Sequence, residues 1–234
     1  MKQIEAGLLK DYYYPDQPEF IGGNFKEKQT SATIENVREG DTCIDIGANF
    51  GYYTLVLSKL VGNSGKVYSF EPVKETVQVL RKVIQCNGIT NVEVYDSAVS
   101  DKDGVAELRS CGAGDLDACL SGGIYIPDVL NWERQTTLET VNVISVDTFV
   151  KTNNLERVDF VKIDTQGLDI LVLEGMKETI NKCRPVIICE CLGQENRDKI
   201  TALFKSINYS YQTTEDIYYA NDCLVEHLLC KPNN

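Results

Sequence analysis

The sequence contains a single histidine, His227, and no Cys-x-x-Cys pair among its nine cysteines. One histidine leaves almost no material for a Ser-His-Asp or Cys-His nucleophilic site. The cysteine spacing gives little support for a zinc site or a redox dithiol. Cys189 and Cys191, two apart in a predicted strand, are interpreted as small buried hydrophobic residues rather than as metal ligands. His227 is expected to be structural or exposed rather than catalytic.

Long apolar runs and basic runs are also missing. No segment approaches the roughly 18 apolar residues that a membrane helix needs, and the N-terminus lacks the pattern of a signal peptide. A cytoplasmic protein with no membrane partner is therefore expected. Only 23 Lys and Arg stand against 35 Asp and Glu, which gives a net charge of −12. Nucleic-acid affinity depends mainly on basic side chains, so no nucleic-acid partner is expected.

The 234 residues, 43% of them hydrophobic, are enough for one large domain. From residue 40 onward, strand-like and helix-like segments alternate, which predicts a largely parallel sheet covered by helices. Residues 1–38 are expected to form an N-terminal cover, and residues 39–234 the main domain. The predicted strands are Thr42–Ile46, Lys66–Glu71, Val92–Asp96, Val158–Asp164, Pro185–Cys191, Tyr209–Thr213 and Leu224–Cys230.

The apolar spacing between these strands predicts four helices. The first begins near Tyr52. The second covers residues 73–89 and stops at Asn87-Gly88, a good C-terminal cap. The third runs without interruption through "GLDILVLEGMKETINK", residues 167–182, and the fourth covers residues 194–208.

Residues 101–140 interrupt this alternation. "DKDGVAELRS" and "TTLETVNVISV" are predicted to form a pair of strands, and the segment between them is rich in glycine and contains the only tryptophan, Trp132. A long irregular insertion in a compact α/β domain is usually functional or disordered. We interpret it as a substrate lid in preference to a surface excursion.

The turn in "TCIDIGANFGYYT", residues 42–54, is the main indication of a ligand. The Gly-x-x-x-x-Gly-Lys-Ser/Thr pattern of a nucleoside triphosphate loop is absent. A dinucleotide fingerprint needs Gly-x-Gly-x-x-Gly; counted from Gly47, the second and third positions are Asn49 and Tyr52. A nicotinamide cofactor is therefore disfavoured but stays an alternative.

A nucleoside without phosphates fits this turn better. S-adenosylmethionine has an amino-acid end, a ribose and an adenine. Its turn needs glycine for close approach and an acidic residue near the ammonium group, and Asp45, Gly47, Asn49 and Gly51 meet this need. Glu71 ends the second strand, where a carboxylate can accept hydrogen bonds from both ribose hydroxyls. That carboxylate alone does not discriminate, because a dinucleotide ribose uses the same position.

Several separate segments share one order and spacing with a known family: the segment from "VREGDTCIDIGANFGYYT" to "VYSFEP", then "SAVSDKDG", "SVDTFV", "RVDFVKIDTQGLDILVLEGM" and "RPVIICEC". In these segments the chain resembles the FkbM-type S-adenosylmethionine-dependent methyltransferases. The resemblance covers roughly residues 35 to 230. It implies the class I methyltransferase fold, a Rossmann-like three-layer α/β sandwich whose seven-stranded sheet is mostly parallel with one antiparallel strand. Members of the family mostly methylate hydroxyl oxygens of sugars and natural products.

The resemblance also implies roles for individual residues. Glu71 would hold the ribose and Asp164 would face the methyl donor or the acceptor. The family usually has Glu in place of Gln166 and of Asp169, so no carboxylate chemistry is expected at Gln166. The remaining cofactor-binding candidates are Asp45, Gly47, Asn49, Gly51 and Tyr52 at the methionine end, and Asp96, Ser97 and Ala98 around the adenine.

A sugar hydroxyl is a poor nucleophile, so a general base would help, typically by ~10²–10⁴-fold. With histidine scarce, the base must be a carboxylate or a metal-bound hydroxyl. Asp164 is the first candidate, because α/β sites gather at the carboxyl ends of strands. Lys162 should pair with it, and a helix N-cap is the alternative role. Glu190 lies in a very apolar strand, where it is either functional or one partner of a buried pair.

The sequence therefore predicts an S-adenosylmethionine-dependent O-methyltransferase that acts on a hydroxyl of a sugar or small metabolite. Asp164 and Glu190 are its catalytic candidates, and dependence on a divalent metal stays open. The alternatives are a nicotinamide-dependent oxidoreductase and a non-catalytic module that keeps the fold.

Overall fold

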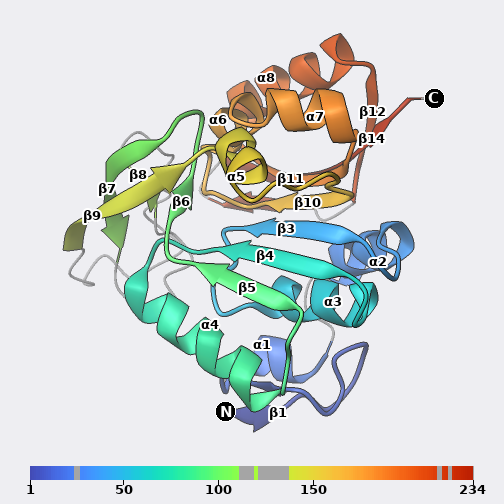
Figure 1. Ribbon diagram of the computed structural model, residues 1–234, viewed down its shortest axis with the longest axis vertical. Helices are drawn as coiled ribbons and strands as arrows, with labels where there is room; N and C mark the ends of the chain where they lie inside the picture. The colour runs from blue at the N-terminus through green and yellow to red at the C-terminus, as the bar shows by residue number, and fades with distance from the viewer. Residues whose placement is uncertain (24–26, 111–118, 121–136, 215–217, 221–222, 234) are drawn as a thin grey trace.

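The computed structural model describes residues 1–23, 27–110, 119–120, 137–214, 218–220 and 223–233. Its centre is a sheet with the strand order β12-β14-β11-β10-β3-β4-β5 (Figure 1). Neighbouring strands from β11 to β5 pair in parallel, and β14 pairs antiparallel with both β11 and β12. This is the arrangement that the sequence predicts. The strands are β3 (Thr42–Ile46), β4 (Lys66–Phe70), β5 (Val92–Tyr95), β10 (Phe160–Ile163), β11 (Val186–Leu192), β12 (Tyr209–Thr213) and β14 (Cys223–Pro232), with the short β13 (Tyr218–Ala220) paired to β14.

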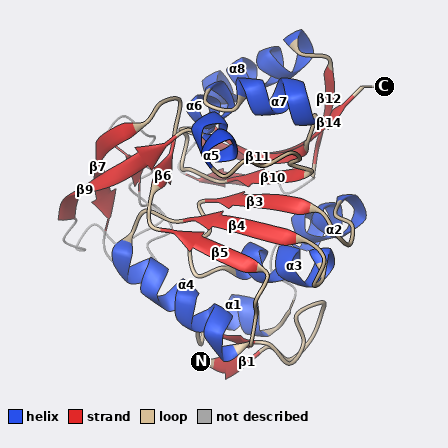
Figure 2. Ribbon diagram, viewed as in Figure 1, coloured by secondary structure: helices blue, strands red, loops and turns tan. Residues whose placement is uncertain are grey.

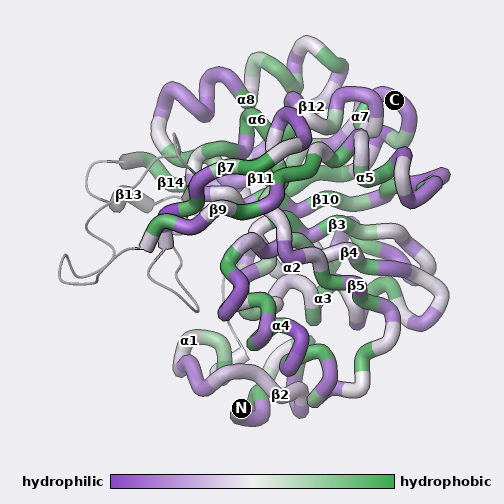
Figure 3. Tube along the Cα trace, turned by 60° about the vertical axis from the view of Figure 1, so that its left-hand side comes forward, coloured by the Kyte–Doolittle hydropathy of each residue, from purple (hydrophilic) through white to green (hydrophobic). Residues whose placement is uncertain are grey.

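The predicted strands agree with the observed ones within two residues at each end. The central strands β3, β10 and β11 are buried along almost their whole length, and Figure 3 shows hydrophobic residues along them. A strand that is covered on both faces is expected to be a nearly continuous apolar run, and the buried residues of these strands are apolar apart from Asp45, Lys162 and Glu190. That pattern made these strands readable from the sequence.

Helices cover both faces of the sheet (Figure 2). One face packs on α5 (Val146–Thr152), α6 (Asp169–Glu174), α7 (Lys177–Cys183) and α8 (Gln194–Ser206) through the largest hydrophobic cluster. The other face packs on α2 (Glu27–Asn36) and α3 (Tyr52–Val61), and α4 (Lys74–Cys86) packs beside α3. The three-layer architecture is therefore as predicted. Within the described residues no helix combines the length and the apolar character of a membrane span.

The prediction of one helix over residues 167–182 is wrong. The structure has two helices there, because the chain breaks at Gly175 between α6 and α7. A Cβ at Gly175 would overlap the carbonyl oxygen of Ser100, and the carbonyl of Gly175 accepts the Asp147 N–H at 2.9 Å. The Asp147 carboxylate in turn accepts the Glu178 and Thr179 N–H groups at the start of α7. These tertiary contacts decide the break.

The insertion and the residues directly before and after it form a separate small sheet with the order β6-β9-β7-β8. The predicted strand pair is confirmed, since β7 (Gly104–Ser110) and β9 (Thr137–Ile144) pair antiparallel. The short strands β6 (Ala98–Val99) and β8 (Cys119–Leu120) flank them. Most of the segment interpreted as a lid, including Trp132, lies outside the described residues.

The N-terminal residues form β1 (Lys2–Gln3), β2 (Tyr13–Tyr14), α1 (Pro18–Ile21) and α2. An aromatic cluster joins this cover to the domain: Tyr14 is buried, and its ring centroid lies 5.0 Å from that of Phe20 and 6.1 Å from that of Tyr52. Tyr14 thus packs the N-terminal segment against α3.

Candidate active site

The turn between β3 and α3 has backbone conformations that glycine adopts without strain. Gly47 has φ 76°, Asn49 49° and Gly51 91°, all in the left-handed region. Asparagine is one of the few other residues that enter this region readily. The Asn49 side chain also accepts the Phe50 N–H at 2.7 Å. Asn49 therefore supplies the backbone conformation that a second glycine would have given.

Glu71 follows β4, and its carboxylate connects the ends of two parallel strands. Its Oε2 accepts the Asn49 N–H and its Oε1 accepts the Val73 N–H, both at 2.9 Å. The side chain is buried, and burial raises its pKa to about 7 despite these two hydrogen bonds; the nearby carboxylates of Asp45 and Asp164 act in the same direction. A carboxylate oxygen accepts up to two hydrogen bonds. Both oxygens of Glu71 thus have the capacity for further donors such as ribose hydroxyls.

Asp45 lies beneath the turn and is fully buried. Its Oδ2 accepts the Thr54 hydroxyl at 2.7 Å, and its Oδ1 has no hydrogen-bond partner within the described part of the chain. Burial raises the pKa of Asp45, although the Lys162 ammonium and the Thr54 hydroxyl oppose the rise. Thr54 thus holds one oxygen of Asp45, and the other oxygen lies 4.0 Å from the Lys162 ammonium.

Lys162 is the buried cation of the site. It lies opposite Asp45 in the parallel pair of β10 and β3. Its Nζ donates to Asp164 Oδ2 at 3.1 Å and lies 4.0 Å from Asp45 Oδ1. Burial alone would lower the pKa of Lys162, but the carboxylates around it outweigh that effect and raise it. The predicted pairing of Lys162 with Asp164 is confirmed, and the lysine stays charged.

Glu190 and His227 continue this polar region across the sheet. They are direct cross-strand partners in the antiparallel pair of β11 and β14, with His227 Nε2 3.8 Å from Glu190 Oε1. Both side chains are almost fully buried. The ligand atoms of Asp164, Glu190 and His227 all lie within 4.8 Å of one another. The alternative of a buried pair for Glu190 is supported. Of the two expectations for His227, structural or exposed, the structure rules out the exposed one.

Asp164 does not cap a helix, so that alternative is wrong. The residues after it form a turn in which Gln166 and Gly167 have positive φ, and α6 begins only at Asp169. The buried Asp169 carboxylate accepts the Thr165 and Gly167 N–H groups at 3.3 and 3.2 Å. Burial raises the pKa of Asp169 to about 7, with Asp164 as the next cause. Asp169 therefore shapes the loop that presents Asp164.

The residues expected around the adenine follow β5, the strand that pairs with β4. Asp96 is exposed, Ser97 is half-buried, and Ala98 is buried in β6 beside Val143 of β9. Asp96 and Ser97 line a surface hollow of about 370 Å³ together with Ile144. The residues that line the hollow do not include the glycine turn or Glu71. The hollow therefore lies between the end of β5 and the small sheet, and it does not contain the tips of β3 and β4.

Tyr52 differs from the other cofactor-binding candidates. Its ring is buried in the aromatic cluster with Phe20 and Tyr53. Its backbone starts α3 directly after Gly51. Any contact with a cofactor is therefore expected from its main chain and not from its ring.

The structure thus brings Asp45, Gly47, Asn49, Gly51 and Glu71 together at two strand tips, with Asp164 on the next strand. Sequence reasoning missed the place of His227. The sequence did contain a relevant signal, because Glu190 and His227 are each a polar residue within an apolar strand, and these two strands are adjacent in the sheet. The register between those strands follows only from the structure.

A family model described as the Methyltransferase FkbM domain matches residues 45–214. Two kinds of curated relative match as well. "Hexuronic acid methyltransferase AglP" of Haloferax volcanii is 24% identical over 185 residues, which is 78% of this chain and 69% of that protein. "Protein-L-isoaspartate O-methyltransferase" of Methanocella arvoryzae is 37% identical over 97 residues, which is 39% of this chain and 51% of that protein.

Solved structures share the fold. "Methyltransferase FkbM" from Methylobacillus flagellatus superposes with a TM-score of 0.55 at 14% identity, over 81% of this chain and 43% of that one. An "rRNA Methylase" from Streptococcus thermophilus gives 0.51 at 12% identity, over 88% and 95%. The chain spans between about a quarter and a half of the length of the first curated relatives it matches.

Proposed function

Because the chain belongs to the FkbM methyltransferase family, we propose that it transfers the methyl group of S-adenosylmethionine to a hydroxyl oxygen of a sugar or other small molecule. The bridge that Glu71 makes between the glycine turn and the end of β4 is the observation that carries this proposal. It offers a carboxylate and a close-approach backbone turn at adjacent strand tips, which a nucleoside without phosphates requires.

The residues present fit this cofactor. Glu71 has acceptor capacity for both ribose hydroxyls, and the buried Oδ1 of Asp45 is an acceptor without a described hydrogen-bond partner. Asp96 and Ser97 would border the adenine. Gly47, Asn49 and Gly51, with the main chain of Tyr52, would surround the methionine end. When bound, the cofactor supplies a methyl group on a positively charged sulfur.

The chain's own residues would position the acceptor and take its proton. In the transfer, a bond forms between the acceptor oxygen and the methyl carbon, and the bond from carbon to sulfur breaks with its electron pair returning to sulfur. The hydroxyl proton goes to a carboxylate of the site. We assign this role to Asp164, which Lys162 holds in place, with Glu190 as the second carboxylate. Positioning contributes most, since well-oriented partners gain roughly 7–11 kcal/mol.

A sugar acceptor is favoured over the alternatives. The hexuronic acid methyltransferase matches 78% of this chain, whereas the isoaspartate methyltransferase match covers 39%. The net charge of −12 disfavours a nucleic-acid acceptor. Family membership also argues against the nicotinamide alternative, which the residues Asn49 and Tyr52 at the second and third fingerprint positions already disfavour.

A transfer assay with radiolabelled S-adenosylmethionine tests the proposal. The acceptor panel should include uronic acids, neutral sugars and small phenols. Product in which the label sits on a sugar oxygen is the expected result. Tight binding of S-adenosylhomocysteine without transfer to any acceptor of the panel would instead favour the non-catalytic alternative.

The affinity for S-adenosylhomocysteine should rise about tenfold between pH 6 and pH 8. The pKa of Glu71 is raised to about 7 by burial, so its carboxyl is mostly protonated at pH 6. The ionised form is the one that accepts both ribose hydroxyls. Affinity therefore increases as pH rises through 7 and levels off above it, by about one factor of ten for one proton.

Isothermal titration at pH 6, 7 and 8 measures this dependence. The variant Glu71→Gln is the reference, because it cannot ionise and should bind more weakly with no slope over this range. Equal slopes in the two proteins would show that Glu71 is not the ribose ligand.

A further inference from the structure

Asp164, Glu190 and His227 come from three adjacent strands and converge at the carboxyl end of the sheet. Asp164 directly follows β10, Glu190 lies in β11 and His227 in β14. One ligand atom from each residue lies within 4.8 Å of the others. Glu190 and His227 are buried and Asp164 is partly exposed, so the cluster has two inner groups and one that faces outward.

The spacing of the two inner groups suits an ion better than a direct hydrogen bond. His227 Nε2 and Glu190 Oε1 are 3.8 Å apart, which is longer than the 2.7–3.2 Å of an N–H···O bond. Two ligands of one ion at about 2.0–2.2 Å stand roughly 3 Å apart when adjacent and about 4 Å when opposite. The observed separation lies between these two values.

The buried charges around the cluster also favour a cation. The carboxylates of Asp45, Asp164 and Glu190 all act on the single ammonium of Lys162. With His227 neutral, as a metal ligand must be, the three carboxylates in their ionised form exceed the one ammonium by two negative charges. One divalent ion has the charge that balances them. Lys162 also holds Asp164 through Oδ2, which fixes the orientation of a potential ligand.

We propose that Asp164, Glu190 and His227 bind one divalent cation, and that Mn²⁺ is the ion best suited to them. Two carboxylates and one imidazole form a mixed oxygen and nitrogen set. Carboxylates suit Mg²⁺ and Mn²⁺, while imidazole suits later transition metals, so Mn²⁺ meets both demands. The partly exposed side of the cluster at Asp164 is where an acceptor oxygen could join the ion.

The role of the ion rests on the proposed function, but its binding does not. If the chain methylates a hydroxyl, an ion at this place would lower the pKa of the bound hydroxyl and orient it. Mn²⁺ binding can be measured without cofactor or acceptor. Failure of the metal site and failure of the methyltransferase proposal are therefore distinguishable.

The test is Mn²⁺ titration of the full chain, without a polyhistidine tag, followed by electron paramagnetic resonance. The sequence has one histidine, so any imidazole nitrogen coupled to bound Mn²⁺ must belong to His227. We expect one Mn²⁺ per chain with a nitrogen coupling in the electron spin-echo signal. No stoichiometric binding, or bound Mn²⁺ without nitrogen coupling, would overturn the proposal.

Two variants complete the test. His227→Gln should lose the nitrogen coupling and weaken Mn²⁺ binding by at least roughly tenfold, with folding checked by circular dichroism. Glu195→Gln changes an exposed carboxylate whose partner is Lys199 on the same helix, and it should bind Mn²⁺ as the wild type does. An equal loss in both variants would show surface binding and overturn the assignment. Wild-type stoichiometry and coupling decide the question even if His227→Gln does not fold.

Discussion

Replacement of Lys162 by methionine is expected to lower the free energy of unfolding by about 3–5 kcal/mol. Methionine keeps much of the apolar stem but removes the ammonium from a position that is 3% exposed. Asp164 then loses a donor at 3.1 Å, and Asp45 loses a cation at 4.0 Å. The Tyr53 ring, whose centroid lies 5.0 Å from Nζ, loses a cation as well. Removing one partner of a buried ion pair is costly because the remaining charge stays buried without compensation.

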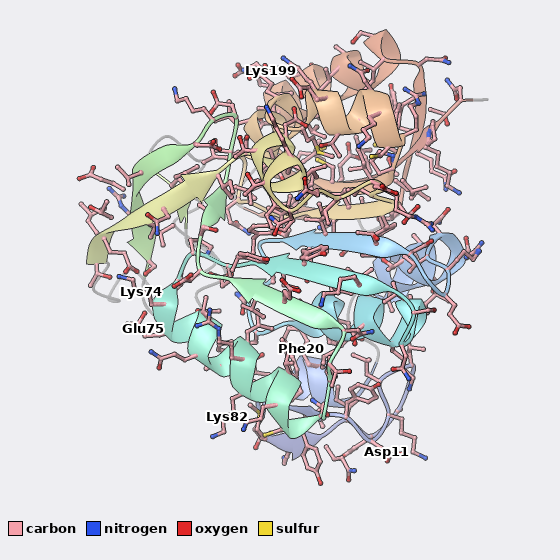
Figure 4. All side chains as sticks on the ribbon, in the orientation of Figure 1. Asp11, Phe20, Lys74, Glu75, Lys82 and Lys199 are labelled. Carbon is pink, nitrogen blue, oxygen red and sulfur yellow. The ribbon has the colours of Figure 1, made fainter. Side chains whose placement is uncertain are left out.

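Urea unfolding followed by circular dichroism measures this change. Lys199→Met is the matched control, since Lys199 lies on the outside of α8 (Figure 4) and pairs with Glu195 in an exposed contact at 2.7 Å. Such surface pairs contribute little, so the control should unfold as the wild type does. If Lys162→Met were as stable as Lys199→Met, Lys162 would not be the charge that holds the buried carboxylates. Failure of Lys162→Met to accumulate as folded protein would agree with the expected loss.

Gly47→Ala is expected to cost roughly 2–5 kcal/mol and to abolish cofactor binding. The left-handed φ of 76° accounts for about 1–2 kcal/mol of this cost. The new methyl group would also overlap the backbone carbonyl of Asp164, and overpacking of this kind adds about 1–3 kcal/mol. Relief of the overlap must move the end of β3 away from the end of β10. That movement displaces both the turn and Asp164.

Gly88→Ala separates the two causes. Gly88 also has a left-handed φ, of 63°, but a Cβ there would have no neighbour within 4 Å. It should therefore lose about 1–2 kcal/mol from conformation alone and bind S-adenosylhomocysteine normally. Denaturant unfolding and calorimetric titration of both variants provide the comparison. If Gly47→Ala and Gly88→Ala lost the same stability and both bound S-adenosylhomocysteine normally, the close approach of β3 and β10 would not be what requires glycine at position 47.

The sequence predicted the main sheet well because each buried strand is short, apolar and bounded by turn residues. Thr42–Ile46 and Tyr209–Thr213 agree to the residue. The break at Gly175 could not be predicted in the same way. Glycine within an apolar helical pattern has a modest cost, and only the approach of the Ser100 backbone makes it an end point.

The glycine turn and Glu71 could also be predicted from the sequence. Turn chemistry and the spacing from Gly47 to Glu71 are local features, and the structure places these residues together. The bridge from Glu71 to Asn49 was not expected, because its register across β3 and β4 depends on the folded sheet.

The contacts of Glu190, His227 and Lys162 were harder to predict from the sequence, for a physical reason. His227 meets Glu190 through an antiparallel pairing, and a shift of one residue in that pairing would turn the imidazole to the opposite face. The number of residues between β12 and β14 does not determine which residue of β14 pairs with Glu190, so the sequence could not predict this register. Lys162 was identified as a partner of Asp164, but its contact with Asp45 again required the sheet.

The most direct test of the account is a crystal structure of the protein with S-adenosylhomocysteine. We expect both ribose hydroxyls to donate to the Glu71 carboxylate, and the sulfur to lie above the turn at Gly47, on the side of Asp164. A nucleoside bound elsewhere, or a crevice at the tips of β3 and β4 filled by side chains, would contradict the account.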